Sequence, residues 1–231
     1  MIKKICVILT LFFSVMPLTF AWNSTGHKLV AEIAYLQLDD SARRQVDQLL
    51  KGQFINASIW ADQLRAKGDK SMDTWHYINL PNPGPQKNVV DAINDNQLPH
   101  LIHWVGDVHQ PLHTLGRDRG GNACYLANNP YGKNLHQFWD NGAGSLYNIK
   151  NLKKTAQAWL NAYPPSVEQL EITDPMQWAQ ESYLLATTQA YVGIEPKNIP
   201  NATYIEKTQL ITKKQIVLAG TRLAQILNNT Y

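Results

Sequence analysis

The stretch at residues 103–113, HWVGDVHQPLH, constrains this chain more than any other, because it places ionisable groups inside an apolar and apparently helical run. A buried imidazole or carboxylate costs free energy unless a partner satisfies it. His103 and Asp107 are four residues apart, so on a helix they project from the same face. Pro111 should end or kink the helix, which would let His113 turn toward that face. A bound metal ion would satisfy these side chains.

The same chemistry recurs elsewhere in the chain. His136 and Asp140, in NLHQFWD, repeat the four-residue spacing, and His27, Asp62 and His76 lie in other short apolar or aromatic segments. Any one of these histidines is more often a hydrogen-bonded structural residue than a ligand, and His/Asp pairs at this spacing also stabilise ordinary helices. Their joint occurrence is what favours a metal site.

Three further residues in or beside the 103–113 stretch lead to separate predictions. The missing side chain of Gly106 would let a cluster or a neighbouring helix approach the backbone, at some cost in helix propensity. His100 and His109 have no partner at ligand spacing, so we expect them to cap the helix or to lie on the surface.

The N-terminus, MIKKICVILTLFFSVMPLTFA, predicts a secretory signal peptide over residues 1–21. Lys3 and Lys4 precede a short apolar stretch, and small residues stand at the usual spacing before a cut between Ala21 and Trp22. The apolar stretch is shorter than the roughly 20 residues of a spanning helix, which disfavours an uncleaved anchor. We therefore expect a protein exported to the periplasm or beyond, with no stable membrane anchor after processing.

Cleavage also changes the charge and the cysteine content. Loss of Lys3 and Lys4 takes the basic residues from 21 to 19 against 18 acidic ones, so the processed chain is nearly neutral and its overall charge gives no argument for nucleic-acid binding. Cys6 leaves with the signal peptide, and Cys124 alone cannot form an internal disulfide. Stability must come from the core or from another source such as metal.

Hydrophobic periodicity predicts one all-α domain over residues 22–231, without internal repeats or a long linker. A continuous loop is expected at 116–134, where RDRGGN and NNPYGKN carry turn residues, and only 75–80 and 124–126 look extended. Apolar positions recurring every three or four residues predict helices at 27–38, 42–50, 56–66, 87–96, 99–110, 151–162, 175–192 and 206–228.

Several motifs, in order along the chain, resemble the S1/P1 nucleases, a family of zinc-dependent secreted enzymes that share a fold with bacterial phospholipase C. They are WNSTGH at 22–27, WADQLR at 60–65, WHYINL at 75–80, HWVGDVHQPLH at 103–113, DRGGN at 118–122 and NLHQFWD at 134–140. The resemblance spans essentially the whole processed chain. It implies a mainly helical fold of the phospholipase C/P1 nuclease type and a cluster of three Zn²⁺ ions with nine ligand residues.

The ligand set implied by the resemblance begins with a pair of ions. Asp62, His76 and His103 would hold the first ion, and Asp107 would bridge it to the second. His27 would hold the second ion, together with the free α-amine and the carbonyl oxygen of Trp22. Signal cleavage would then complete the site, because it creates that amine.

The third ion implied by the resemblance would be held by His113, His136 and Asp140. Imidazole and carboxylate groups suit zinc in each of these positions.

The activity that the resemblance implies is hydrolysis of single-stranded DNA and RNA to 5′-phosphate products, with 3′-nucleotidase activity as a further expectation. Zinc would activate the attacking water and stabilise the leaving oxygen. Asp62 would also orient that water, and Arg65, one turn later, would hold the carboxylate or the phosphate unless it forms only a surface ion pair. Tyr77 would offer a stacking face to a base unless it is a core aromatic residue. Asn79 stands where the family commonly has an aspartate that hydrogen-bonds a base.

Two alternatives remain open at this point. One is a phospholipase C on the same fold, which would act on lipid head groups. The other is a periplasmic zinc-binding protein without catalysis, although dispersed single histidines differ from the flexible histidine-rich runs of storage proteins.

Overall fold

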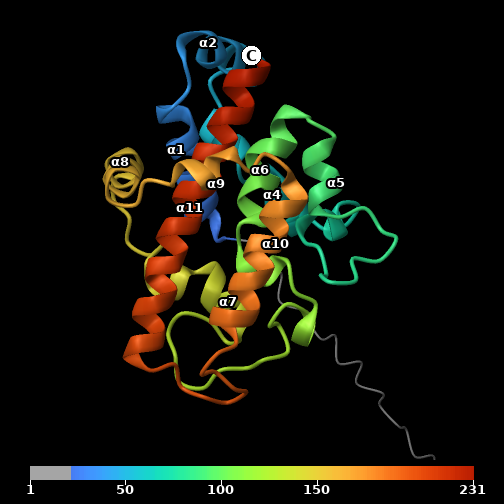
Figure 1. Cartoon of the computed structure of the whole chain (residues 1–231), viewed down its shortest axis with the longest axis vertical. Coiled ribbons are helices and arrows are strands. Elements are labelled where there is room, and N and C mark those ends of the chain that lie inside the picture. The colour runs from blue at the N-terminus through green and yellow to red at the C-terminus, as the bar shows by residue number, and fades with distance from the viewer. Residues whose placement is uncertain (1–21) are drawn as a thin grey trace, which may run out of the picture.

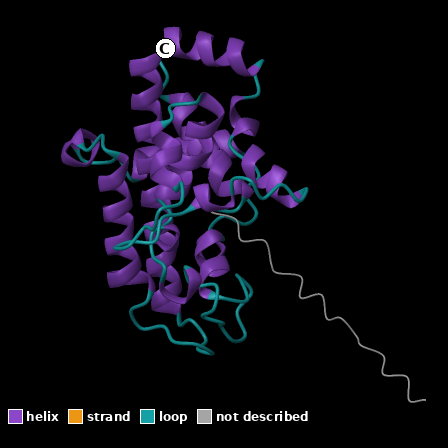
Figure 2. Ribbon diagram, turned by 90° about the vertical axis from the view of Figure 1, so that its right-hand side faces the viewer, coloured by secondary structure: helices purple, strands orange, loops and turns teal. Residues whose placement is uncertain are grey.

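The computed structural model describes residues 22–231, so the predicted signal peptide lies outside the described residues. Helices joined by loops make up this part of the chain, and no strand occurs in it (Figures 1 and 2). The α-helices are α1 (Ser24–Leu36), α2 (Asp40–Leu50), α3 (Phe54–Ala57), α4 (Trp60–Ala66), α5 (Val89–Asn94), α6 (Leu98–Val108), α7 (Leu135–Asp140), α8 (Leu152–Ala162), α9 (Val167–Glu171), α10 (Pro175–Leu185) and α11 (Ala202–Thr230).

Short 3₁₀ and π segments complete the described secondary structure. The all-α prediction is confirmed, and the extended pieces reduce to isolated bridges that pair Leu80 with Leu115 and Tyr125 with Asn134. The 3₁₀ helices are η1 (Asp73–His76), η2 (Pro111–His113), η3 (Arg117–Arg119) and η4 (Gly142–Gly144), and a π-helical turn, η5 (Ala186–Ala190), continues α10.

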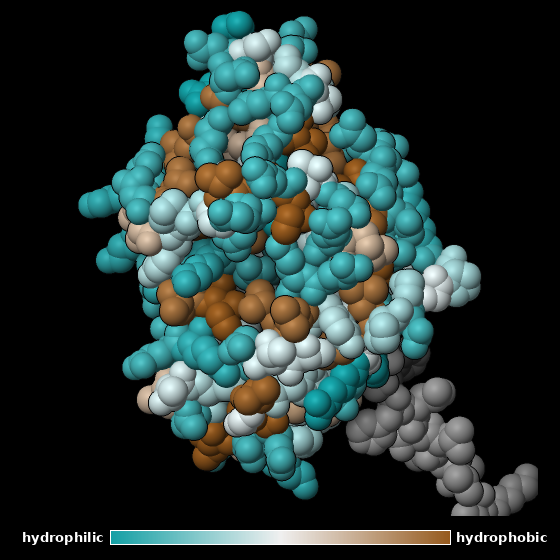
Figure 3. Space-filling model, viewed as in Figure 1, coloured by the Kyte–Doolittle hydropathy of each residue, from teal (hydrophilic) through white to brown (hydrophobic). Residues whose placement is uncertain are grey.

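Two hydrophobic cores are arranged along α11, which runs nearly the whole length of the molecule (Figure 1). The larger core packs α1, α6 and α11 together and includes the fully buried Trp104. The smaller core packs α7 against η5 and the start of α11, where Trp139 donates a hydrogen bond to Tyr204 (3.0 Å). The surface of the face seen in Figure 1 is mainly hydrophilic, with apolar side chains in several separate patches (Figure 3).

The predicted helix at 56–66 is wrong as one continuous element, because the chain breaks between α3 and α4 at Ser58 and Ile59. The buried Ser58 carbonyl accepts a hydrogen bond from His103 Nδ1 (2.7 Å) in place of a partner along a helix. The break therefore supplies an acceptor to a predicted metal ligand. Elsewhere α9 was not predicted, and the predicted loop at 116–134 contains the turn η3.

The 103–113 stretch folds as its proline predicts. Helix α6 ends at Val108, and Pro111 opens η2, which turns His113 away from the line of the helix. At Gly106 an added Cβ would lie only 3.0 Å from His27 Nδ1. The prediction that this glycine admits a neighbouring helix is therefore confirmed, and the helix is α1.

His109 was predicted to cap the helix or to lie on the surface. It caps the end of α6 but is fully buried, so the surface position is wrong. Its Nδ1 donates to the Val105 carbonyl (2.7 Å), and its Nε2 accepts from Arg222 of α11 (2.8 Å), which also pairs with Glu181 (2.7 Å). Burial and the charge of Arg222 lower the pKa of His109 to about 3, so it stays neutral and can accept. His100 is half-buried and stacks on Trp60.

The crossing of α1 and α11 supplies a test of core packing. An alanine Cβ at Gly220 would lie 2.6 Å from Ile33 Cγ2 and 2.8 Å from the Val30 carbonyl oxygen. Although alanine favours helix, we expect the overpacking in Gly220→Ala to destabilise the fold by about 1–3 kcal/mol. Thermal unfolding should show a Tm lowered by about 2–4 °C per kcal/mol. Leu210→Ala, on the exposed face of α11, is the control, with an expected change below about 0.5 kcal/mol. An unchanged Tm for Gly220→Ala would contradict a tight crossing.

Candidate metal centre

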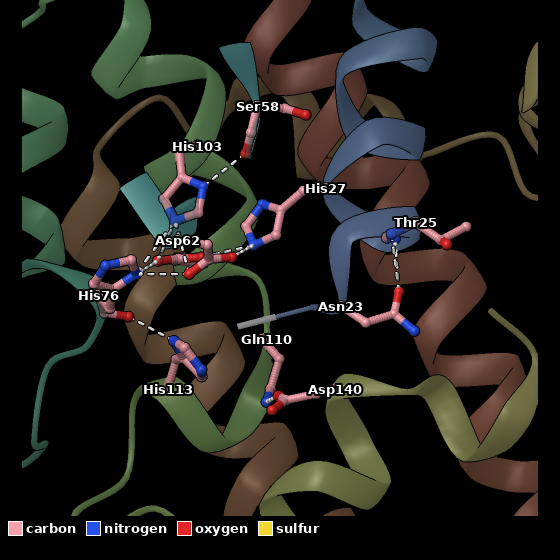
Figure 4. A network of polar contacts seen from close by, with 12 residues as sticks. Asn23, Thr25, His27, Ser58, Asp62, His76, His103, Gln110, His113 and Asp140 are labelled. Carbon is pink, nitrogen blue, oxygen red and sulfur yellow. Dashed lines mark hydrogen bonds and ion pairs between the residues drawn. The ribbon is translucent and has the colours of Figure 1, made fainter. Parts of the chain in front are cut away.

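Eight imidazole and carboxylate side chains from distant parts of the chain meet in the interior (Figure 4), and none exposes more than 5% of its surface. They form three groups of three, and within each group the candidate ligand atoms lie within 4.8 Å of one another. The first two groups share His103: the first is His27, His103 and Asp107, the second is Asp62, His76 and His103, and the third is His113, His136 and Asp140. The eight are His27 on α1, Asp62 on α4, His76 at the end of η1, His103 and Asp107 on α6, His113 at the end of η2, and His136 and Asp140 on α7.

Asp107 belongs to the first group and also contacts His76 of the second. Its Oδ2 lies 2.9 Å from His76 Nδ1 and 3.4 Å from His103 Nε2, whereas its Oδ1 lies 3.3 Å from His27 Nε2. Asp62 faces the same three rings at 3.8–3.9 Å. A carboxylate that contacts different rings through its two oxygens has the arrangement needed to bridge two cations.

The third group lies beside the first two, below them in Figure 4. His113 Nε2 and His136 Nε2 are 3.2 Å apart, and His136 Nε2 is 3.5 Å from Asp140 Oδ2. The other oxygen of Asp140 accepts a hydrogen bond from Gln110 Nε2 (2.6 Å). Two imidazole nitrogens so close together need a shared proton or a cation between them.

Backbone carbonyls orient the rings. Nδ1 of His103 donates to Ser58, that of His113 donates to His76 (2.5 Å), and that of His136 donates to Gly120 (2.6 Å). In each ring Nε2 is then the atom that faces the other candidate ligands. Such outer contacts are typical of metal-binding histidines, because they fix the tautomer and the ring plane.

Unsatisfied polar atoms test whether these residues suit a metal. Both nitrogens of His27, both carboxylate oxygens of Asp62 and Oδ1 of Asp107 are buried without a hydrogen bond to any residue that the structure describes. Leaving such groups unsatisfied is costly, and a cation would satisfy them together. Nitrogen and oxygen ligands of this kind are those that zinc takes, so the residues fit a zinc cluster.

Opposing effects set the protonation of the first two groups. Burial lowers the pKa of His103, but the negative charges of Asp107 and Asp62 outweigh burial and raise it to about 9. Burial favours the neutral form of Asp107, yet the charge of His103 and hydrogen bonds from the surrounding rings hold its pKa well below the usual value. His103 therefore carries a proton at neutral pH in the metal-free chain.

Burial dominates in the third group. It lowers the pKa of His113 to about 3, with a further contribution from the neighbouring His136. It also raises the pKa of Asp140 well above the usual value, despite the hydrogen bond from Gln110. His113 is thus neutral and ready to coordinate, whereas burial opposes the ionised form of Asp140 that a cation would favour.

The backbone of the first described residues lies against α7. Asn23 donates its backbone N–H to the Asp140 carbonyl (2.9 Å) and caps α1 by accepting from Thr25 and Gly26 (both 3.1 Å). Trp22 is fully buried, and an added Cβ at Gly26 would lie 2.6 Å from Trp22 Cβ. The N-terminal segment is therefore anchored beside the third group, and the role of the Trp22 amine stays a prediction.

Sequence patterns did not reveal every partner of the remaining candidate residues. Arg65 Nε forms an ion pair with Asp73 of η1 at 2.9 Å, a partner that was not predicted. Tyr77 is 37% exposed, so it is not a core aromatic residue and keeps a face available for stacking. Asn79 is exposed next to Gly116, where an added Cβ would lie 3.3 Å from Asn79 Oδ1.

The known proteins to which this chain is similar are nucleases. The family model described as S1/P1 Nuclease matches residues 22–97 and 85–231. Endonuclease 2 of Arabidopsis thaliana is 24% identical over 93% of this chain and 92% of its own length. Nuclease S1 of Aspergillus oryzae is 24% identical over 91% and 92% of the two chains, and nuclease P1 of Penicillium citrinum is 23% identical over 91% and 98%.

Metal affinity should depend on pH, because a cation must displace a proton from His103. For chelator-treated protein, we expect the apparent affinity for zinc to rise with pH until about 9, the pKa of His103, and to level off above it. Titration against a competing chelator at a series of pH values measures this. His103→Gln should weaken binding and flatten the rise between neutral pH and about 9. A wild-type affinity that is constant over this range would contradict the assigned protonation.

Proposed function

The chain belongs to the S1/P1 nuclease family, and on that premise we propose that it is an exported, zinc-dependent endonuclease that hydrolyses single-stranded DNA and RNA to 5′-phosphate products. The family places it among the hydrolases that act on ester bonds, with nucleic acid as substrate. We also propose 3′-nucleotidase activity. Processing before Trp22 and a periplasmic or extracellular location are part of the proposal. Among the described residues, no helix is long and apolar enough to cross a membrane.

The observation that carries the proposal is the convergence of eight buried side chains into three groups, two of which share His103. We assign one Zn²⁺ to each group. Asp107 would bridge the first two sites, and the Trp22 amine and carbonyl would complete the site at His27. The unsatisfied atoms of His27, Asp62 and Asp107 support the assignment of the first two sites, because these groups gain a partner when a cation binds. For the third site the support is the 3.2 Å approach of His113 Nε2 and His136 Nε2.

Zinc, when bound, supplies Lewis acidity that lowers the pKa of water and stabilises charge on phosphate oxygens. The chain's own residues position the reactants. Asp62 lacks a hydrogen bond at either oxygen within the described part of the chain, so one oxygen can ligate while the other accepts a proton from the attacking water and orients it.

Arg65 is placed to support the phosphate. Its ion pair with Asp73 fixes the Nε edge of the guanidinium. Its positive charge opposes the rise that burial causes in the Asp140 pKa, so the guanidinium lies within electrostatic reach of the third group. A guanidinium in that position suits a phosphate, which it can bind through a fork of hydrogen bonds.

Base contacts are assigned to Tyr77 and Asn79. The exposed Tyr77 follows His76 directly, and a stacked base would gain about 1–3 kcal/mol. Asn79 offers both donors and an acceptor where a carboxylate offers acceptors only. These two residues would therefore hold the nucleoside next to the metal centre.

Activity on defined substrates tests the proposed function. We expect chelator-sensitive cleavage of single-stranded DNA and RNA, with 5′-phosphate ends, and no release of head group from phosphatidylcholine. Asp62→Asn should lower the rate by about 10²-fold or more, since it removes both a ligand and a proton acceptor. Asp40→Asn, at an exposed site on α2, is the matched control and should leave the rate unchanged. Activity on lipid alone would favour a phospholipase C, and inactivity on both with metal still bound would favour a non-catalytic zinc protein.

The free N-terminus supplies an independent test. A protein carrying one extra residue ahead of Trp22 lacks the amine at the assigned position, so we expect it to lose one equivalent of zinc and much of its turnover. Metal content by elemental analysis and rate should be measured beside protein that begins at Trp22. Equal zinc content and equal turnover in the two preparations would remove Trp22 from the ligand set.

A further inference from the structure

The turn that contains the DRGGN motif is left-handed at four consecutive residues. The φ angles are 49° at Asp118, 57° at Arg119, 64° at Gly120 and 82° at Gly121. Glycine adopts this conformation freely, and aspartate tolerates it through its short polar side chain. A long side chain such as that of arginine meets a steric penalty there. Arg119 is therefore the unexpected residue of the turn.

The site explains why the turn has this shape. The Gly120 carbonyl accepts the Nδ1 hydrogen of His136, and an added Cβ at Gly120 would lie 2.8 Å from the Leu112 carbonyl oxygen. At Gly121 an added Cβ would lie 3.2 Å from the His136 nitrogen. The backbone must approach the third group closely, so two positions require glycine. The position before them is also left-handed but keeps an arginine.

Contacts within the protein do not account for that arginine. Its side chain is exposed, and no hydrogen bond, ion pair or ring contact of its guanidinium involves a residue that the structure describes. Arg117, two residues earlier, differs: its guanidinium lies 4.2 Å from the centre of the Tyr191 ring and its Nε lies 3.5 Å from Asp118. Arg119 is held through its backbone: its N–H donates to the Gly116 carbonyl (3.1 Å), and its carbonyl accepts from Asn122. Arg119 thus combines a strained backbone with a guanidinium that has no partner among the described residues, and it lies next to the third group.

We propose that Arg119 binds a phosphate of the substrate strand outside the scissile linkage, and so favours polynucleotides over dinucleotides. The inference rests on the proposed function and names a further specificity-determining residue for it. A guanidinium binds phosphate through paired hydrogen bonds, and backbone phosphate contacts position a strand without reading its sequence. Because the whole chain is nearly neutral after processing, attraction to the strand must come from local cations such as this one.

Arg119→Gly removes the positive charge without disturbing the fold, because glycine suits the left-handed backbone. Its Tm should be equal to or above the wild-type value. With zinc-loaded enzyme, we expect kcat/KM on a single-stranded oligonucleotide to fall by about tenfold at low salt. The slope of log(kcat/KM) against log salt concentration should become less negative by about 0.7. Cleavage of a dinucleotide should stay unchanged, because no phosphate then reaches position 119.

Two matched variants complete the experiment. Asp118→Gly relieves the same kind of backbone strain without removing a cation, so it should keep the wild-type salt dependence. Arg119→Lys retains the charge and should keep most of that dependence as well. An unchanged salt dependence in Arg119→Gly, or an equal loss on oligonucleotide and dinucleotide, overturns the inference. Wild-type enzyme that cleaves neither substrate overturns the proposed function itself, and the inference with it.

Discussion

The rest of the structure depends on the burial of charged and polar groups that the protein alone does not satisfy. His27 and Asp62 lie in the interior with ligand atoms that make no hydrogen bond to the described residues, and the ring nitrogens of His113 and His136 face each other at 3.2 Å. Such an arrangement is expensive in a protein interior unless cations enter it. Folding and metal binding are therefore coupled, which matters the more because the buried Cys124 is a free cysteine in the described part of the chain.

Helix α6 positions the candidate ligands of the metal centre relative to one another. One of its faces carries His103 and Asp107, and Gly106 between them lets α1 bring His27 close. Its end is attached to α11 by the contact between His109 and Arg222, and Gln215 of α11 donates to the His109 carbonyl (3.1 Å). The long, well-packed helix α11 thus stabilises the position of the shorter α6, whose buried polar residues would otherwise weaken its packing.

Around this centre, irregular backbone performs much of the orientation. The break at Ser58 and the left-handed turn at Gly120 each present a carbonyl to a histidine Nδ1. The same turn keeps Arg119 exposed beside the third group. The orientation of the candidate ligands therefore depends on local backbone features as well as on the helices.

The sequence by itself determined the all-α class, the end of α6 before Pro111 and the side chains that converge at the centre. Spacing of four residues places His136 and Asp140 on one face of a helix, and the periodicity of apolar residues marks helices whatever their neighbours are. The assignment of individual ions, of Arg65 and of the Trp22 amine came from family resemblance and remains proposed.

Only the tertiary structure decided which backbone and side-chain groups contact these residues. A backbone carbonyl has no sequence signature, so the roles of Ser58 and Gly120 could not be read from the chain. The pairing of Arg65 with Asp73 and of His109 with Arg222 joins separate elements, and their distances depend on how every intervening side chain packs. Local spacing determines which residues share a helix face, whereas only packing determines what that face meets.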